Sequence, residues 1–120
     1  LVRVIQGKVL DVAVDIRKGS PTFGKHVCVE LSSENKKQML VPRGFAHGFV
    51  VLEDDTVFAY KVDNYYSPEN DRGILFDDAT LNIDWQIAHD ELNLSAKDKV
   101  QPKLEDTQDI FDYEVDYYND

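Results

Sequence analysis

The sequence predicts an all-β domain, a sandwich or barrel of short strands. Between Val2 and Asp63, short runs rich in β-branched and aromatic residues alternate with turn signals such as QGK, KGSPTFG and SENKK. In VLDVAVDIR a period of two separates an apolar face from a largely polar one. The apolar face holds Val12, Val14 and Ile16, and the other holds Asp11, Ala13, Asp15 and Arg17. A helical period does not fit this pattern.

Two further strands are expected in FAHGFVVL and TVFAYKVD. The loop Glu53–Asp55 between them has a length typical of hairpins, so the two strands are expected to pair antiparallel. His47 and Tyr60 would then lie close together. The sequence leaves their register open.

The chain changes character after Asp63. A polar, aromatic loop, NYYSPENDRG, leads to an expected short strand ILFDD and a β-like segment in ATLNIDWQI. Ser95 followed by Asp98 gives a helix-start signal, and Pro102 ends any helix that begins there. The tail, residues 107–120, carries five acids, no base and four aromatics, and is expected to be either docked or frayed.

Length and charge limit the function classes. A chain of 120 residues corresponds to one domain, residues 1–120. Its formal charge of −10 argues against nucleic acid and membrane surfaces as partners, although a local basic cluster can still hold a small anion. The lone Cys28 excludes an intrachain disulfide, and no long apolar segment is present, which indicates a cytoplasmic protein.

Few chemical motifs occur. His26, His47 and His89 are far apart in sequence, so no metal site is expected. Glycine-rich phosphate loops and nucleophile elbows are not found either. Proton-transfer and anion-binding candidates remain: His47, Tyr60, Tyr66, Asp71, Lys97 and Asp98. Each also has a structural interpretation, such as a hydrogen-bonded core histidine, a packing tyrosine or a solvated charge pair.

A family resemblance decides between these interpretations. VRVIQGKVLDVAVDIRKGSPTFG, VPRGFAHGFVVLED, AYKVDNYYSPENDRGILFDD and LNIDW follow one another as in the dTDP-4-dehydrorhamnose 3,5-epimerases. The chain resembles this family from Leu1 to about Glu105. The resemblance implies a cupin-type double-stranded jelly roll, a homodimer, and epimerisation of a dTDP-linked 4-keto-6-deoxy sugar at C3 and C5. It implies no metal and no cofactor.

The same resemblance implies roles for single residues. Tyr60 matches the proton donor, and Asp98 matches the acid that pairs with the catalytic histidine. His47 matches a histidine that holds the nucleotide, and Tyr66 a tyrosine that stacks on thymine. Asp71 matches a polar substrate contact, and Lys97 a basic diphosphate contact.

The resemblance also implies residues that these 120 do not include. The family's base is the histidine of an Arg-Gly-x-His motif upstream of Leu1. The arginine of this motif and a lysine are also expected before Leu1. The chain is therefore expected to be catalytically impaired by itself. Missing leading strands would expose sheet edges and the face of Val12, Val14 and Ile16, which a second copy or an N-terminal segment is expected to cover. Two alternatives stay open: a single-carbon deoxysugar epimerase and a noncatalytic sugar-nucleotide-binding module.

Overall fold

The computed structural model describes residues 1–88, 91–107 and 110–118, so His89 lies outside the described residues. The longer strands are β1 (Val2–Gln6), β2 (Lys8–Asp15), β4 (His26–Ser32), β6 (Phe45–Val51) and β7 (Val57–Tyr60). The two-residue strands are β3 (Arg17–Lys18), β5 (Gln38–Met39) and β8 (Phe111–Asp112). Short 3₁₀ helices are η1 (Pro68–Asn70), η3 (Lys97–Lys99) and η4 (Leu104–Asp106). The predicted all-β class is confirmed.

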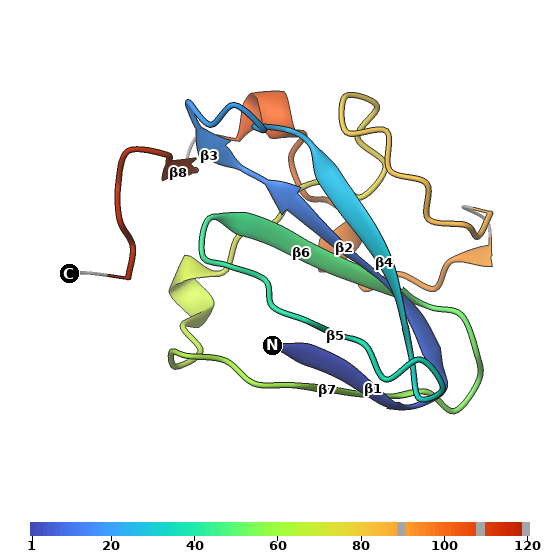
Figure 1. The fold of residues 1–120 in the computed structure, drawn as a ribbon. Helices are drawn as coiled ribbons and strands as arrows, with labels where there is room; N and C mark the ends of the chain where they lie inside the picture. The colour runs from blue at the N-terminus through green and yellow to red at the C-terminus, as the bar shows by residue number, and fades with distance from the viewer. Residues whose placement is uncertain (89–90, 108–109, 119–120) are drawn as a thin grey trace.

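Two antiparallel sheets form the body of the fold. Their strand orders are β5-β1-β7 and β4-β2-β6, and they lie face to face in Figure 1. Between them, Val2 and Val4 of β1 pack with Val9 of β2 and Leu31 of β4. The ring of Phe49 in β6 lies 4.5 Å, centroid to centroid, from that of Phe58 in β7. This apolar cluster closes one end of the space between the sheets.

The predicted hairpin of β6 and β7 is wrong. β6 pairs with β2, whereas β7 pairs with β1 in the other sheet. The connection after Val51 crosses between the sheets and is held by hydrogen bonds from Gln6 Nε2 to the Asp55 carbonyl and from Thr56 Oγ1 to the Glu53 carbonyl. Crossing lets the apolar faces of the two strands bury against each other, which pairing within one sheet would not achieve.

The turn from β1 to β2 makes a similar crossing. Gly7 there has a φ of +89°, and a Cβ on this residue would collide with Thr56. Only glycine combines this backbone conformation with so close an approach.

Both faces of β2 are buried, including the largely polar one. Val12, Val14 and Ile16 do share a face, as predicted, but they are covered by Leu81 and Leu104 of the C-terminal half and not exposed. On the opposite face Asp11 and Asp15 point between the sheets, with at most 1% of either residue exposed. Strand β2 is therefore the centre of the domain.

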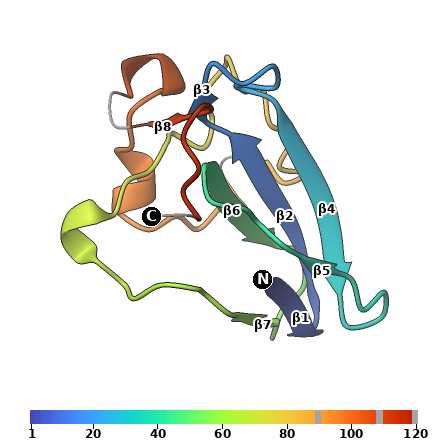
Figure 2. The same ribbon diagram turned by 60° about the vertical axis from the view of Figure 1, so that its left-hand side comes forward.

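The C-terminal half covers the outer face of the β4-β2-β6 sheet without forming the strands expected at 74–78 and 79–87 (Figure 2). Local polar contacts compete with strand pairing there. The Asp78 carboxylate accepts hydrogen bonds from the N–H groups of Thr80 (2.8 Å) and Leu104 (2.7 Å). Burial raises the pKa of Asp78, but these hydrogen bonds outweigh it and leave the pKa below its ordinary value. Trp85 Nε1 donates to the carbonyl of Phe76 at 2.9 Å.

The tail is docked over its described part, residues 110–118. β8 runs parallel to β3, with Arg17 opposite Phe111 and Lys18 opposite Asp112. The helix-start signal at Ser95 produces only the short η3, in which the Asp98 N–H donates to Ser95 Oγ at 3.3 Å. In the described part of the chain no helix is long and apolar enough to cross a membrane.

Asp15 anchors the DIRKGSPTFG segment. Its carboxylate accepts two hydrogen bonds from the Arg17 guanidinium, both 2.9 Å, and further bonds from Ser20 and Thr22. The hydrogen bond from Arg17 is the largest influence on Asp15 and holds its pKa well below the ordinary value of 3.8.

We predict that Asp15→Asn lowers the unfolding free energy by about 2–4 kcal/mol near neutral pH, because the ion pair of the buried carboxylate with Arg17 is lost. A lowered folded-state pKa stabilises the fold above the ordinary pKa, and this contribution declines as pH falls. The gap between wild type and variant, measured by urea unfolding, should therefore shrink from about pH 5 to about pH 3. Asp54→Asn, at an exposed loop acid, is the control. A gap that does not change with pH would contradict the assignment.

Candidate active site

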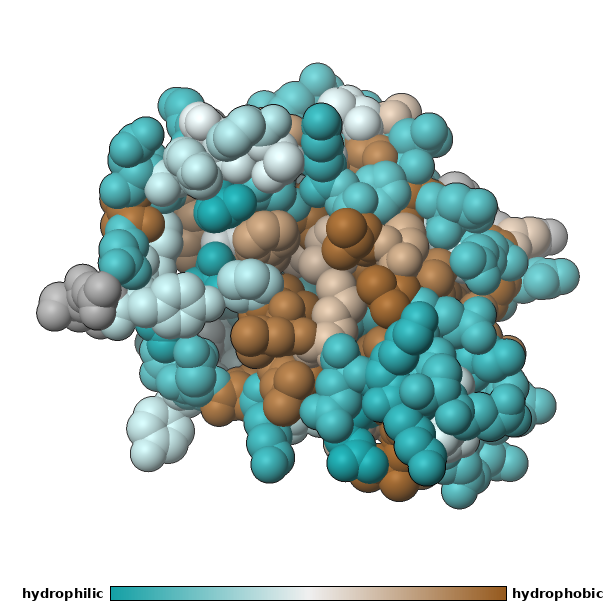
Figure 3. All heavy atoms as spheres, in the orientation of Figure 1, coloured by the Kyte–Doolittle hydropathy of each residue, from teal (hydrophilic) through white to brown (hydrophobic). Residues whose placement is uncertain are grey.

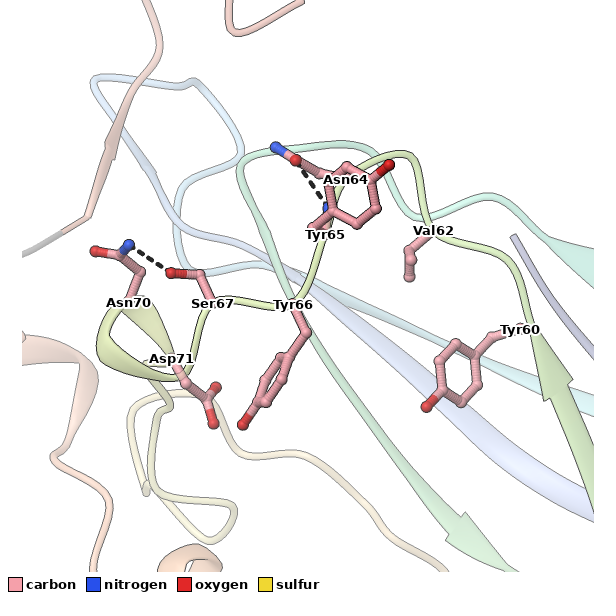
Figure 4. A pocket seen from close by; sticks show the side chains of 8 residues that line it. All are labelled: Tyr60, Val62, Asn64, Tyr65, Tyr66, Ser67, Asn70 and Asp71. Atoms are coloured by element: carbon pink, nitrogen blue, oxygen red, sulfur yellow. Dashed lines mark hydrogen bonds between the residues drawn. The ribbon is translucent and has the colours of Figure 1, made fainter.

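An open pocket of about 400 Å³ lies where β7 ends. Its lining residues are Tyr60, Val62, Asn64, Tyr65, Tyr66, Ser67, Asn70 and Asp71 (Figure 4). Pro68 opens η1, and Asn70 Nδ2 donates to Ser67 Oγ at 2.8 Å, which gives this loop a defined shape. Figure 3, in the orientation of Figure 1, shows apolar side chains gathered over the middle of one face, with hydrophilic ones around them.

Three tyrosines of this pocket differ in position. All three line the pocket; the Tyr60 and Tyr66 rings have their hydroxyl groups toward the same end, whereas the Tyr65 ring points away from both (Figure 4). Tyr66 is 77% exposed and Tyr65 is 96% exposed. Exposed aromatic rings beside an open cavity suit a flat ligand that stacks on them.

Asp71 and Lys97 meet at this pocket although they are 26 residues apart. Lys97 Nζ donates to Asp71 Oδ2 at 3.1 Å. This hydrogen bond is the main reason that the pKa of Lys97 is raised. Both residues were predicted substrate contacts, and the structure pairs them with each other. A ligand phosphate could take the place of Asp71 on Lys97, since an ammonium binds either anion.

Asp98 follows Lys97 in η3. Its charge also contributes to the raised pKa of Lys97. The structure thus groups Asp71, Lys97 and Asp98. The predicted pairing of Asp98 with a catalytic histidine stays a prediction.

His47 has both a buried partner and an exposed surface. Its Nε2 donates to Asp11 Oδ1 at 2.6 Å, where the Asp11 side chain is fully buried and that of His47 is 29% exposed. His47 lies opposite Ala13 in the register of β2 and β6, which places Asp11 on the diagonal. The carboxylate holds the ring in one orientation while part of the ring stays open to a ligand.

His47 and Tyr60 lie in different sheets but face the same space. His47 shares a strand face with Phe49, and Tyr60 shares one with Phe58. The contact of Phe49 with Phe58 brings these two faces together. The hairpin on which their expected proximity was based is not formed, and His47 is not among the residues that line the pocket beside Tyr60.

The sequence interpretation missed Asp11. It lies on the largely polar face of β2. A carboxylate between Leu10 and Val12 in an apolar strand was the available signal, because such a group needs a buried partner. Its Oδ2 is buried and has no hydrogen-bond partner in the described part of the protein. Among the described residues, no group of three or more His, Cys, Asp or Glu side chains is arranged to hold a metal ion.

Comparison with known proteins identifies the family of the chain. Residues 1–106 match the profile of the family described as dTDP-4-dehydrorhamnose 3,5-epimerase. The chain belongs to this family. The epimerase of that name from Shigella flexneri is 59% identical over 87 residues, which cover 72% of this chain and 48% of the relative. The chain spans about half the length of the curated relatives it matches.

Solved structures of epimerases have a fold similar to that of this chain. A dTDP-6-deoxy-D-glucose-3,5-epimerase of Legionella pneumophila, in complex with dTDP-4-keto-L-rhamnose, has a TM-score of 0.90 at 46% identity, covering 95% of this chain and 61% of that one. A 3'-monoepimerase of Streptomyces bikiniensis, in complex with dTDP-quinovose, has a TM-score of 0.79 at 31% identity, covering 87% and 52%. The predicted cupin-type fold is confirmed.

We predict that Asp71→Asn lowers the pKa of Lys97, because its strongest hydrogen-bond acceptor loses its charge. An NMR titration of the Lys97 side chain measures this change. Glu69→Gln, at an exposed acid of η1, is the matched control. If the Lys97 titration is the same in wild type and Asp71→Asn, the ion pair is not formed in solution.

Proposed function

We propose that this protein epimerises C3 and C5 of dTDP-4-dehydro-6-deoxyglucose to give dTDP-4-dehydrorhamnose, without a cofactor. The observation that carries the proposal is the pocket between Tyr60 and Tyr66, which lies within the family-matched residues. Legionella's related enzyme was solved with dTDP-4-keto-L-rhamnose, which supports this substrate class.

The chemistry uses the acidity of protons beside a ketone. A base removes the proton at C3 or C5, the electron pair moves into an enolate on the C4 oxygen, and an acid returns a proton from the opposite face. We assign the acid to Tyr60, whose ring borders the pocket. Asp98 would orient the basic histidine of the family's Arg-Gly-x-His motif, which these 120 residues do not contain.

The nucleotide is held by other groups. Tyr66 would stack on the thymine ring, since its exposed ring lines the pocket wall. Lys97 would contact the diphosphate, and His47 would contact the nucleotide. Asp71 would accept a hydrogen bond from the substrate. Because Asp71 already binds Lys97, the two must exchange partners when a diphosphate enters.

The proposal extends to the oligomeric state and the cellular location of the whole protein. We infer a homodimer, as the family resemblance implies. We also place the protein in the cytoplasm, where the exposed thiol of Cys28 stays reduced.

Tyr60→Phe tests the proposal. In the intact protein it should leave the Kd for dTDP within a few-fold and reduce turnover by about 10²–10⁴-fold, because only the proton transfer is lost. Turnover is followed by NMR of the dTDP-4-keto-6-deoxy sugar. Tyr113→Phe, in the tail, is the control. Wild-type turnover in Tyr60→Phe would refute the role of Tyr60.

A second candidate is epimerisation at one carbon. The likeness to the Streptomyces bikiniensis 3'-monoepimerase favours it. Running the reaction in D₂O separates the candidates, since each carbon that is deprotonated takes up solvent deuterium. Deuterium at C3 and C5 supports the main proposal, and deuterium at C3 alone supports the second. Binding of dTDP without exchange at either carbon would indicate a noncatalytic module.

The position of the thymine ring gives a further prediction. Tyr66→Ala should weaken dTDP binding by about 1–3 kcal/mol, the range for loss of base stacking on an aromatic ring. Tyr65→Ala is the matched control and should have little effect, because the Tyr65 ring is 96% exposed and points away from Tyr60 and Tyr66. Calorimetry with dTDP measures both. Equal losses at the two positions would contradict the assignment of Tyr66.

A further inference from the structure

The docked tail lies outside the residues that match the epimerase family, which end at 106. Its described part, residues 110–118, is nevertheless held at several points. Besides the pairing of β8 with β3, the Tyr113 N–H donates to the Lys18 carbonyl at 3.0 Å. Within the tail, Phe111 and Tyr117 pack edge to face with their ring centroids 4.9 Å apart.

Arginines of the family-matched part receive this tail. The Arg17 guanidinium lies 5.0 Å from the centre of the Tyr113 ring, and that of Arg43 lies 4.9 Å from the Tyr118 ring. Arg43 makes the larger set of contacts. Its backbone N–H donates to the Tyr118 hydroxyl at 2.7 Å, and its Nη1 donates to the Tyr117 carbonyl at 2.6 Å.

Arg43 also reaches the pocket loop. Its Nη2 forms an ion pair with Asp63 Oδ2 at 3.1 Å. Asp63 lies between the pocket residues Val62 and Asn64 and three residues before Tyr66. One guanidinium thus binds the tail through one nitrogen and the pocket loop through another.

This geometry restricts the loop. Before Asp63, the Lys61 N–H donates to the carbonyl of Leu1, the residue that precedes β1, at 2.8 Å. After it, the Tyr65 N–H donates to the side chain of its neighbour Asn64, and the next turn begins at Ser67. An arginine whose guanidinium is held by a carbonyl and a ring loses less side-chain entropy when it pairs with Asp63 than a free one would.

We propose that Arg43 is a positioning residue and that the tail acts as a strap that holds it. Through Asp63, the strap keeps the loop in the conformation that presents Tyr66 to the nucleotide. The proposal rests on the proposed function for its ligand, and its mechanical part rests on the contacts alone. Among the described residues, neither Arg43 nor the tail lines the pocket, so we expect the effect to fall on binding.

The experiment compares Arg43→Gln with removal of residues 110–120 in the intact protein. Each change should weaken dTDP binding about two- to fivefold, the range that an exposed ion pair contributes. KM should rise by a similar factor while kcat stays near wild type. Arg3→Gln is the matched control, because Arg3 is an exposed arginine of β1 that lines a different pocket.

A second readout needs no ligand. Hydrogen exchange of the amides at 62–67, and chymotrypsin cleavage after Tyr65 and Tyr66, should both become faster in the two variants. Arg43→Lys keeps a charge for Asp63 and should lie between Arg43→Gln and wild type. The double variant should resemble each single variant, because both changes break one connection. Thermal unfolding of each variant identifies any general loss of stability.

Unchanged exchange at 62–67 in Arg43→Gln, or additive effects in the double variant, would overturn the proposal. Equal acceleration throughout the protein, with a lower Tm, would overturn it too, since Arg43 would then be only structural. If wild type fails to bind dTDP but exchange at 62–67 still accelerates, the strap is supported and the proposed function fails.

Discussion

Two buried carboxylates on β2 each need a hydrogen-bonding partner, and the rest of the structure depends on this constraint. Asp11 and Asp15 lie between the sheets with almost no exposure, and an unpaired charge there would cost several kcal/mol. Asp15 is satisfied by Arg17 and its neighbours, which shapes the DIRKGSPTFG turn. Asp11 requires His47, which requires the observed register of β6 on β2. The same pairing orients His47 toward the space that Tyr60 faces.

The covering of the opposite face has a different character. There, separate apolar side chains from irregular segments pack on the sheet without forming strands: Leu81, Ile83, Trp85 and Leu104. Asp78 joins two of these stretches by accepting N–H groups from each. This irregular segment also carries Lys97 to Asp71, so the closure of the core and the assembly of the pocket rim depend on the same part of the chain.

Alternation of apolar and polar residues was enough to predict β1, β2, β4, β6 and β7. It could not predict partners, because alternation identifies a face but not the sheet to which a strand belongs, and so the hairpin prediction failed. Irregular chain at 74–87 was mistaken for strand because its spaced apolar residues resemble alternation. The family motifs identified Tyr60, Tyr66 and Asp71, which line the pocket, and Lys97, which pairs with Asp71. Asp11 and Arg43 were missed because their contacts join residues 36 and 20 or more positions apart.

We propose that the pocket between Tyr60 and Tyr66 holds a thymidine diphosphate group. A crystal structure of the intact protein with dTDP tests it most directly. We expect the thymine ring to stack on Tyr66 and the diphosphate to contact Lys97, replacing the bond of Lys97 to Asp71. Thymine bound elsewhere, with Tyr66 uncovered and Lys97 still on Asp71, would contradict it.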